Sequence, residues 1–309
     1  MKKLFIAVVM LLTALAATLY FSPAALTASV LLLERQMAGL SERQIALGDL
    51  SIHYYEGGPV RGETIVMIHG FGASKDNWLR FARHFTARYR VIALDLPGFG
   101  DSDRPDGSYD VGTQAERLES FAKALGLGKI HLVGNSMGGH IAGIFAARYP
   151  QQVSSLGLFS TGGISAPNKS ELFRLIESGQ PNPLVVRNAE DYQRMLDFVF
   201  VVPPALPDSV KAWLAERSVA SQAHYDDVFH QLRERYIPLE PELPRIEAPT
   251  LLLWGDRDRV LDVSSITVMK PLLKKPSVVI MQNCGHAPMI ERPEETARHY
   301  QAFLDANRG

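Results

Sequence analysis

The stretch that decides the fold is residues 130–149, which read IHLVGNSMGGHIAGIFAARY. Its first four residues form an apolar run typical of a short buried strand, and residues 137–149 have the composition of a helix. Between them lies the pattern G-x-S-x-G, whose glycines remove side chains that would clash in a tight turn. A strand, a tight turn and a helix in this order would leave the hydroxyl of Ser136 exposed above a sheet.

Other short apolar runs extend the pattern on both sides of this stretch. They are bounded by glycine or proline, as buried strands of a parallel sheet often are, and they cover residues 64–68, 89–94, 156–159, 250–254 and 277–281. Helical stretches alternate with them, at residues 114–125, 137–149 and 294–304. The alternation predicts an α/β fold with a mostly parallel central sheet and helices on both faces.

One region breaks the alternation of strands and helices. Residues 162–240 contain many prolines and helical fragments but few strand signals, so we expect a helical cap inserted above the sheet. The core is then divided into a first part at residues 41–161 and a second part at residues 241–309. Residues 1–40 precede the core and contain a membrane anchor followed by a juxtamembrane helix.

The anchor is predicted from residues 4–21, which carry no charge and read LFIAVVMLLTALAATLYF. A helix that crosses the hydrocarbon layer needs ~20 apolar residues, with ~17 as a lower limit, so this stretch is just long enough. Lys2 and Lys3 precede it, and positive charge favours the cytoplasmic side. The sequence therefore predicts a single-pass protein with a cytoplasmic N-terminus and the rest of the chain outside the inner membrane.

A cleaved signal peptide is the alternative to this anchor. Residues 14–16, Ala-Leu-Ala, fit the small-x-small cleavage pattern, and cleavage there would leave Ala17 as the mature N-terminus. The apolar character continues beyond residue 16, which favours the retained anchor. Small alanines at positions 7, 14 and 17 offer helix contacts, but alanine is common in such helices, so the sequence leaves a homodimer open.

Ser22 and Pro23 interrupt the apolar segment. Either the proline kinks one continuous helix, or Ser22 caps a second helix that has Pro23 as its first residue. In the second case the helix has one apolar face, formed by Leu26, Val30, Leu33 and Met37. This face would lie on lipid or pack on the globular domain. The sequence does not choose between these two positions.

Three side chains are candidates for nucleophilic catalysis. A serine hydroxyl needs an adjacent base, and His286 follows the last predicted strand, where a loop can bring it to Ser136. The imidazole in turn needs an acid, and Asp256 and Asp258 both follow the strand predicted at residues 250–254. The spacing alone does not choose between these two carboxylates, and either could instead cap a turn.

The same chemistry needs two backbone amides for the oxyanion of a tetrahedral intermediate. The amide of Met137, directly after the nucleophile, is one candidate. The other should come from the loop after the strand at residues 64–68, which reads His69-Gly70-Phe71-Gly72, and we assign it to Phe71.

Composition excludes several other kinds of function. The formal net charge is −1, so there is no electrostatic reason to expect nucleic acid as a partner. Cys284 is the one cysteine, which rules out an intrachain disulfide. We find no spacing of histidine, cysteine and carboxylates that suggests a zinc site, and the expected chemistry requires no metal or organic cofactor.

At this point the sequence resembles the α/β-hydrolase fold family. The resemblance runs from about residue 50 to the end apart from the cap, and rests on HGFG at 69–72, DLPGFGDS at 95–102, GNSMGG at 134–139, WGDRD at 254–258 and GH at 285–286. In that family the acid matches the last aspartate of W-G-x-x-D, which implies Asp258. With its anchor, the chain is similar to membrane-tethered bacterial lipases, in particular the inner-membrane phospholipase A1 type with a periplasmic catalytic domain.

The resemblance implies an esterase that removes acyl chains from membrane lipids, most specifically phospholipids, through an acyl-enzyme on Ser136. One alternative is a carbon–carbon bond hydrolase of aromatic ring-fission products, which has a similar serine motif. Another is a non-catalytic binding protein on a hydrolase scaffold. Apolar cap residues, including Phe198 and Phe200, would line an acyl route together with Phe71, or would only attach the cap to the core.

Overall fold

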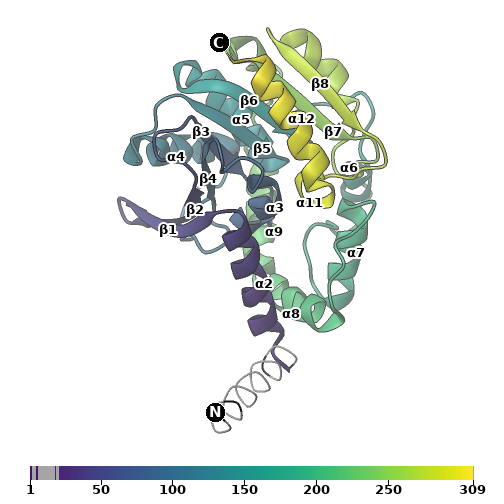
Figure 1. The fold of residues 1–309 in the computed structure, drawn as a ribbon. Coiled ribbons are helices and arrows are strands. Elements are labelled where there is room, and N and C mark those ends of the chain that lie inside the picture. Colours follow the sequence, from purple (N-terminus) through teal and green to yellow (C-terminus); the bar gives the residue numbers. More distant parts are fainter. Residues whose placement is uncertain (2–4, 6–17, 19–20, 309) are drawn as a thin grey trace.

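The central element of the fold is one eight-stranded sheet (Figure 1). The structure, a computed structural model, describes residues 1, 5, 18 and 21–308. The strands lie in the order β1-β2-β4-β3-β5-β6-β7-β8. Their bounds are β1 Leu40–Leu47, β2 Leu50–Gly57, β3 Thr64–Ile68, β4 Arg90–Leu94, β5 Ile130–Asn135, β6 Val153–Phe159, β7 Thr250–Gly255 and β8 Pro276–Met281.

The sheet is mostly parallel, as the sequence predicts. All neighbours from β4 to β8 pair in parallel, and Val66 of β3 lies between Ile92 of β4 and Leu132 of β5. The first two strands form an antiparallel hairpin that also pairs antiparallel with β4. The sequence does not indicate this hairpin, because most side chains of β1 are exposed and the strand has no continuous apolar run.

Helices cover both faces of the sheet and bury two apolar clusters. On one face lie α4 (Val111–Ala124), α5 (Met137–Arg148) and α10 (Ser265–Met269). On the other lie α3 (Leu79–Ala82), α11 (Pro288–Glu291) and α12 (Pro293–Ala306). Short 3₁₀ turns connect these elements at η1 Lys75–Trp78, η2 Pro150–Gln152, η3 Leu243–Arg245 and η4 Lys270–Leu272. The α5 helix is buried along nearly its whole length, so the turn before it is held firmly.

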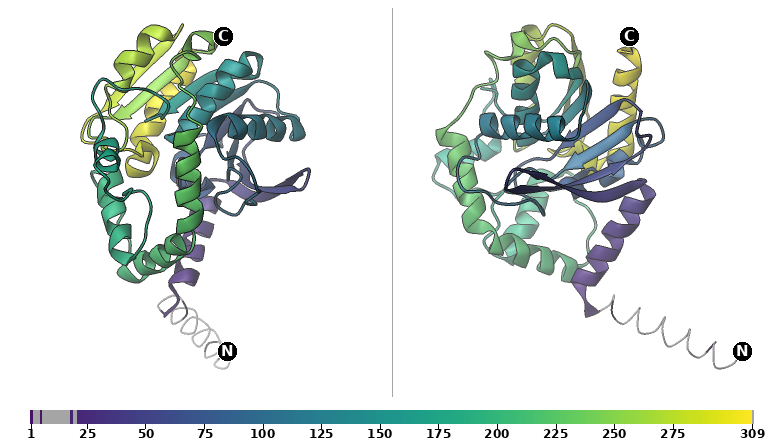
Figure 2. Two further views of the ribbon diagram at one scale, coloured as in Figure 1. Left: turned by 180° about the vertical axis from the view of Figure 1, so that it is seen from behind. Right: turned by 90° about the vertical axis from the view of Figure 1, so that its left-hand side faces the viewer.

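Four helices lie between β6 and β7, in the region where we expect the cap. They are α6 (Glu171–Glu177), α7 (Ala189–Val199), α8 (Asp208–Ala220) and α9 (Gln222–Glu234). Together they form an arch that extends away from the sheet (Figure 2). The two ends of the arch return to the loops that follow the parallel strands: Leu172 N donates to Arg259 O, and the ring of Tyr225 contacts that of Phe71.

The N-terminal helix α2 (Pro23–Met37) lies beside α8 and β1 (Figure 1). Ser22 is its N-cap, since the hydroxyl accepts a hydrogen bond from Ala25 N at 3.2 Å and proline is the first helical residue. This is the second of the two alternatives that the sequence left open at residues 22 and 23.

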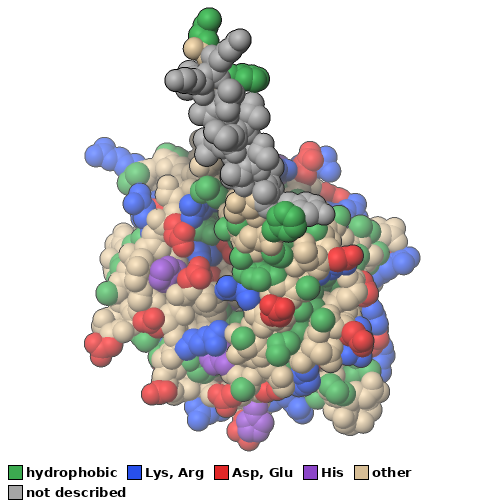
Figure 3. All heavy atoms as spheres, turned by 90° about the horizontal axis from the view of Figure 1, so that it is seen from below, with side chains coloured by type: hydrophobic (Ala, Val, Ile, Leu, Met, Phe, Trp, Pro, Cys, Tyr) green, Lys and Arg blue, Asp and Glu red, His purple; other side chains and the backbone are tan. Residues whose placement is uncertain are grey.

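One side of α2 packs on the domain and another faces outward. Leu31 contacts the core, and Glu34 forms an ion pair with Arg80. Of the four residues of the predicted apolar face, Leu26 is half-buried, whereas Val30, Leu33 and Met37 are 43%, 56% and 61% exposed. Most of this face therefore does not pack on the domain, and Figure 3 shows hydrophobic side chains among charged ones at this end of the molecule.

The predicted membrane anchor lies almost wholly outside the described residues. Among residues 1, 5, 18 and 21–308, no helix combines the length and the apolar character that a membrane span requires. The anchor at residues 4–21 and its alternative, a cleaved signal peptide, both stay predictions.

Candidate active site

The turn between β5 and α5 presents Ser136 in a conformation that few side chains adopt. Its φ is 58° and its ψ is −121°, a strained combination for a residue with a Cβ atom. The backbone holds the turn, because Ser136 N donates to Phe159 O on β6 at 3.0 Å. Ser136 is half-buried, so its hydroxyl lies at the surface of the core, as a nucleophile must.

The two glycines of the motif are required by close backbone contacts. A Cβ atom on Gly134 would lie 2.2 Å from Gly138 O, and one on Gly138 would lie 2.3 Å from His69 O. Both contacts are far shorter than a carbon and an oxygen allow. The glycines therefore let the helix begin directly against the strand, which the sequence pattern predicts for a nucleophile turn.

The loops after β7 and β8 bring the predicted acid and base together. His286 Nδ1 lies 2.9 Å from Asp258 Oδ2, and both side chains are buried. The other oxygen, Asp258 Oδ1, accepts hydrogen bonds from Val260 N and Leu261 N, each at 2.9 Å. A carboxylate held in this way can keep the proton of the imidazole on Nδ1, which leaves Nε2 free to accept a proton.

The geometry separates the two candidate aspartates. Asp256 is only half-buried, and its Oδ1 lies 3.4 Å from Cys284 N, which describes a carboxylate that caps a turn. Asp258 is the one of the two whose carboxylate contacts His286. Asp258, the residue that the family resemblance implies, is thus the aspartate in contact with His286, and its role as the acid stays a prediction.

Asn135 links the nucleophile turn to the histidine loop, a role that the sequence does not indicate. Its Nδ2 donates to Phe159 O at 3.1 Å and to His286 O at 3.0 Å. The side chain is buried between the two loops, so it fixes the backbone of His286 relative to Ser136. The pattern G-x-S-x-G allows any residue here, so the motif carries no signal for this role.

The predicted oxyanion amides come from two segments that flank Ser136. Met137 is the first residue of α5, where backbone N–H groups have no partner within the helix. On the other side the loop after β3 passes directly against the nucleophile, since a Cβ atom on Gly70 would lie 3.1 Å from Ser136 Cβ. The next residue in that loop is Phe71, so both predicted donors belong to segments that adjoin the serine.

Side chains at both ends of the Phe71 loop hold it against the loop after β4. His69 Nε2 accepts from Leu96 N at 3.0 Å, so its proton is on Nδ1, which donates to Gly70 O at 2.7 Å. Burial lowers the pKa of His69, which keeps the imidazole neutral. At the other end the buried Lys75 ammonium binds Asp95 at 2.7 Å and Asp101 at 2.6 Å.

The Phe71 side chain contacts the cap. Its ring lies 5.7 Å from that of Tyr225 and 5.6 Å from that of Phe229, both on α9, with edge-to-face geometry. It also contacts Phe99, at 6.2 Å between centroids. The loop that carries one predicted oxyanion donor therefore packs against the last helix of the cap.

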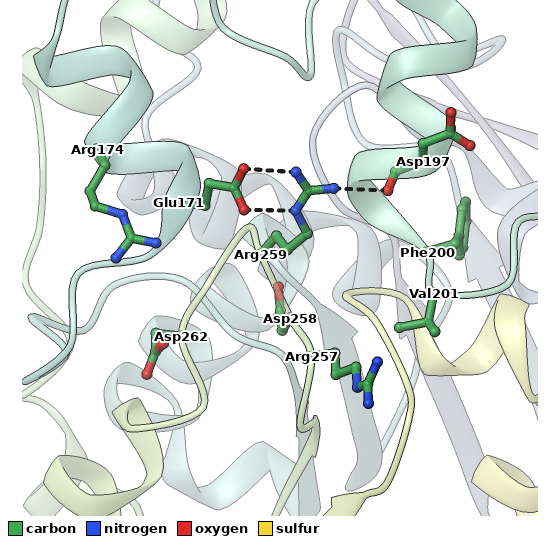
Figure 4. A pocket seen from close by; sticks show the side chains of 9 residues that line it. All are labelled: Glu171, Arg174, Asp197, Phe200, Val201, Arg257, Asp258, Arg259 and Asp262. Carbon is green, nitrogen blue, oxygen red and sulfur yellow. Dashed lines mark hydrogen bonds and ion pairs between the residues drawn. The ribbon is translucent and has the colours of Figure 1, made fainter.

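The two predicted acyl-chain residues lie in different surroundings. Phe198 is buried with Leu172 and Val260, and the Arg259 guanidinium lies 4.6 Å from its ring centroid. Phe200, which follows α7, lines an open pocket of about 470 Å³ beside Asp258 (Figure 4). The other side chains that line this pocket are mostly charged, which suits an acyl chain poorly.

The described part of the chain gathers no group of three or more side chains suited to a metal ion. The site instead consists of a half-buried serine, a buried Asp–His pair and two backbone segments against the serine. The family model for the alpha/beta hydrolase fold matches residues 63–293. The chain belongs to the α/β-hydrolase family.

Similar proteins of this α/β-hydrolase family include lipases. Lipase 1 of Psychrobacter immobilis is 36% identical over 91% of this chain and 90% of its own. A crystal structure described as a membrane phospholipase A, a novel bacterial virulence factor, superposes with a TM-score of 0.92 at 62% identity, over 100% of both chains. A serine hydrolase involved in carbazole degradation has a TM-score of 0.73 at 26% identity, over 86% of this chain and 99% of its own.

Proposed function

We propose that this α/β-hydrolase is a membrane-anchored phospholipase A that releases fatty acids through an acyl-enzyme on Ser136. Its class, a carboxylic ester hydrolase that acts on lipids, follows from the lipases and the membrane phospholipase A that it resembles. The observation that carries the mechanism is the 2.9 Å contact between His286 and Asp258, in a loop that Asn135 joins to the strained turn of Ser136.

In the first half-reaction the Ser136 hydroxyl attacks the carbonyl carbon of the ester. His286 Nε2 takes the hydroxyl proton, and Asp258 stabilises the imidazolium that forms. The carbonyl oxygen becomes an oxyanion, which accepts hydrogen bonds from Phe71 N and Met137 N. When the intermediate collapses, the ester C–O bond breaks and the imidazolium donates its proton to the departing alcohol oxygen, which leaves the acyl group on Ser136.

The second half-reaction releases the acyl group. A water molecule donates a proton to His286 Nε2 as its oxygen attacks the acyl-enzyme carbonyl, and the same two amides stabilise the second oxyanion. Collapse breaks the bond to Ser136 Oγ, which takes back the proton from the imidazolium. A free fatty acid leaves, and neither half-reaction consumes a cofactor.

The proposed location follows from the N-terminal residues and from α2. The apolar residues 4–21 would cross the bacterial inner membrane, with the catalytic domain in the periplasm. The outward face of α2, with Val30, Leu33 and Met37, would then lie close to the lipid from which the substrate comes. A similar chain described as a membrane phospholipase A supports membrane association, whereas a homodimer stays open.

We also propose an apolar route for the acyl chain between cap and core. Each CH₂ group that leaves water contributes about 0.8 kcal/mol, so a long chain gains much from such a route. Phe71, Phe198 and Phe200 are the proposed contacts. If Phe200 lines the route, Phe200→Ala should impair long-chain esters far more than short soluble ones. Equal losses on esters of both lengths would show that the side chain only attaches the cap to the core.

The two alternative functions are less well supported. The carbazole-degrading serine hydrolase is 26% identical to this chain, against 36% for Lipase 1 and 62% for the membrane phospholipase A. A binding protein would have no need of a buried Asp–His pair in a loop that is joined to a nucleophile turn. Neither alternative accounts for an apolar N-terminal segment.

A substrate panel tests the proposed function. The purified full-length protein is incubated with phospholipids, glycerides and short-chain esters, and the fatty acid released is measured. We expect release from phospholipid vesicles, with a lysophospholipid as the second product. Activity confined to glycerides or short esters would contradict the phospholipase assignment, and no release from any ester would contradict the function as a whole.

A further inference from the structure

A short segment of the cap passes between the two loops that carry the Asp–His pair. It comprises residues 197–202, which are the end of α7 and the residues that follow it. Asp197 O accepts from Arg259 Nη1 at 3.1 Å, on the acid loop. Val199 O accepts from the backbone N–H of His286 itself at 2.8 Å. The cap is therefore attached to both catalytic loops by backbone atoms of one six-residue segment.

Glu291 completes this attachment from the core side. It is the last residue of α11, and each of its two carboxylate oxygens accepts a hydrogen bond from a backbone amide. Oε2 accepts from Gly285 N at 2.9 Å, one residue before the histidine, and Oε1 accepts from Val202 N at 3.0 Å, in the cap. One carboxylate thus joins the histidine loop to the cap segment, with charge-assisted bonds on both sides.

The contact leaves little space for the histidine loop to move. A Cβ atom on Gly285 would lie 2.4 Å from Val199 O and 3.0 Å from Phe200 Cα, so only glycine lets the two backbones approach this closely. On the far side, Asn135 Nδ2 donates to His286 O at 3.0 Å. The histidine backbone is therefore held through its own N–H, its own carbonyl and the preceding amide.

The acid loop is held to the same part of the cap. Arg259 follows Asp258 directly, and its guanidinium binds both oxygens of Glu171 on α6 at 2.7 Å each (Figure 4). The Arg259 carbonyl accepts from Leu172 N at 3.1 Å. Figure 4 shows the arginine between Glu171 on one side and Asp197 on the other, where it joins α6 to α7.

We propose that Glu291 is a positioning residue for His286, and that it acts by fixing the histidine loop to the cap segment 197–202. The inference rests on the proposed function, in which His286 transfers the protons. The imidazole must meet both Asp258 and Ser136 with correct geometry, and an error of about 1 Å in such a site can cost a hundredfold in rate. The α6–α7 half of the cap is then part of the catalytic scaffold and stays in place during turnover.

Two conservative variants separate geometry from charge. Glu291→Gln keeps the length of the side chain but has one acceptor oxygen for two amides. Glu291→Asp keeps the charge but is one methylene shorter, so it cannot reach both amides. Glu294→Gln is the matched control, because Glu294 is exposed on the adjacent helix α12. All three are made in the full-length protein, and the thermal midpoint Tm is measured for each.

The experiment measures kcat and KM on a short soluble ester, and the low-field proton NMR signal of the His286 Nδ1–H. We expect both Glu291 variants to lose about tenfold to a hundredfold in kcat with little change in KM, and to shift or broaden this signal. The control should match the wild type. The proton signal reports the Asp258–His286 contact and does not require turnover. An inactive wild type would therefore contradict the proposed function, but the proton signals of the wild type and the Glu291 variants could still be compared.

Two results would overturn the proposal. If both variants keep the wild-type kcat and the wild-type proton signal, Glu291 has only a structural role, whatever happens to Tm. If Glu291→Gln is impaired while Glu291→Asp is not, the charge of the carboxylate matters and the attachment of the two segments does not.

Discussion

At the scale of single residues, the site depends on which atoms each side chain binds. Asp258 has one oxygen on His286 and the other on two backbone amides, so its position is fixed from both sides. Asp256, two residues earlier, contacts a backbone amide at 3.4 Å instead. The same residue type thus takes two different roles within one turn, and the difference is in the direction of the side chain.

The two aspartates give the first prediction. Asp258→Asn should lower kcat by about 10⁴-fold, because an amide in this position no longer favours the tautomer in which His286 Nε2 accepts a proton. Asp256→Asn should have a far smaller effect. Both variants are assayed on one ester at saturating concentration. If Asp256→Asn loses most of its activity while Asp258→Asn stays active, the assignment of the acid is reversed.

The sequence indicates candidate residues whose position follows from a strand end, and does not indicate those whose partners lie far away in the chain. Ser136 and His286 each follow a predicted strand, in glycine-containing turns. Asn135, Arg259 and Glu291 act on backbone atoms of segments remote in sequence. Because any segment supplies such atoms, no residue pattern marks these contacts.

At the scale of elements, strands with a continuous apolar run are predicted by the sequence, and strands without one are not. The strands β3 to β7 have such runs because both faces of the sheet are covered there, and the edge strand β8 has one although Val278 and Ile280 are exposed. The hairpin of β1 and β2 has no such run, because most side chains of the edge strand β1 are exposed and β2 mixes polar with apolar side chains. For helix α2 the sequence offers Ser22 as the N-cap but does not indicate how the helix packs, because its contacts include ion pairs with distant residues, such as Glu34–Arg80.

The element that carries the serine also gives the fold a dependence on pH. His140 is buried in α5, and its Nε2 contacts Ile237 O at 2.8 Å. Burial lowers the pKa of His140 to about 4, below its ordinary value of 6.5. Between these two values the unfolded chain binds a proton that the folded chain does not. The contribution of neutral His140 to the free energy of unfolding should therefore be fully present above pH 6.5 and decrease as the pH falls towards 4.

Chemical denaturation of the wild type and of His140→Gln tests this dependence. Gln is chosen because its amide can still donate to Ile237 O. Between pH 7 and pH 5, His140 should cost the wild type about 2 kcal/mol of unfolding free energy that the variant does not lose. The other buried histidines are present in both proteins and cancel in the comparison. Equal losses in the two proteins would show that His140 is protonated in the folded state.

At the scale of the whole molecule, the proposed anchor would place the site close to its substrate. Helix α2 joins residues 4–21 to a domain whose cap helix α8 lies beside it. A span of ~20 apolar residues holds a protein in a bilayer without any charge contacts. The catalytic domain would then work at the membrane surface, where its lipid substrate is concentrated.

Extraction of membranes tests the anchor. The full-length protein should stay with membranes after a wash in high salt or alkaline carbonate, because neither removes a spanning helix. A version without residues 1–21 should become soluble, keep its rate on short esters and lose much of its action on phospholipid vesicles. Recovery of the full-length protein in the soluble fraction with Ala17 at its N-terminus would instead mean a cleaved signal peptide.

The central claim is that Ser136 forms the acyl-enzyme by which the protein releases fatty acids from phospholipid. The most direct measurement is fatty acid release from phospholipid vesicles by the wild type and by Ser136→Ala. We predict a loss of about 10⁴-fold or more in the variant, with an unchanged Tm, because the other triad members cannot replace the nucleophile. Release by a folded Ser136→Ala protein at the wild-type rate would contradict this role of Ser136.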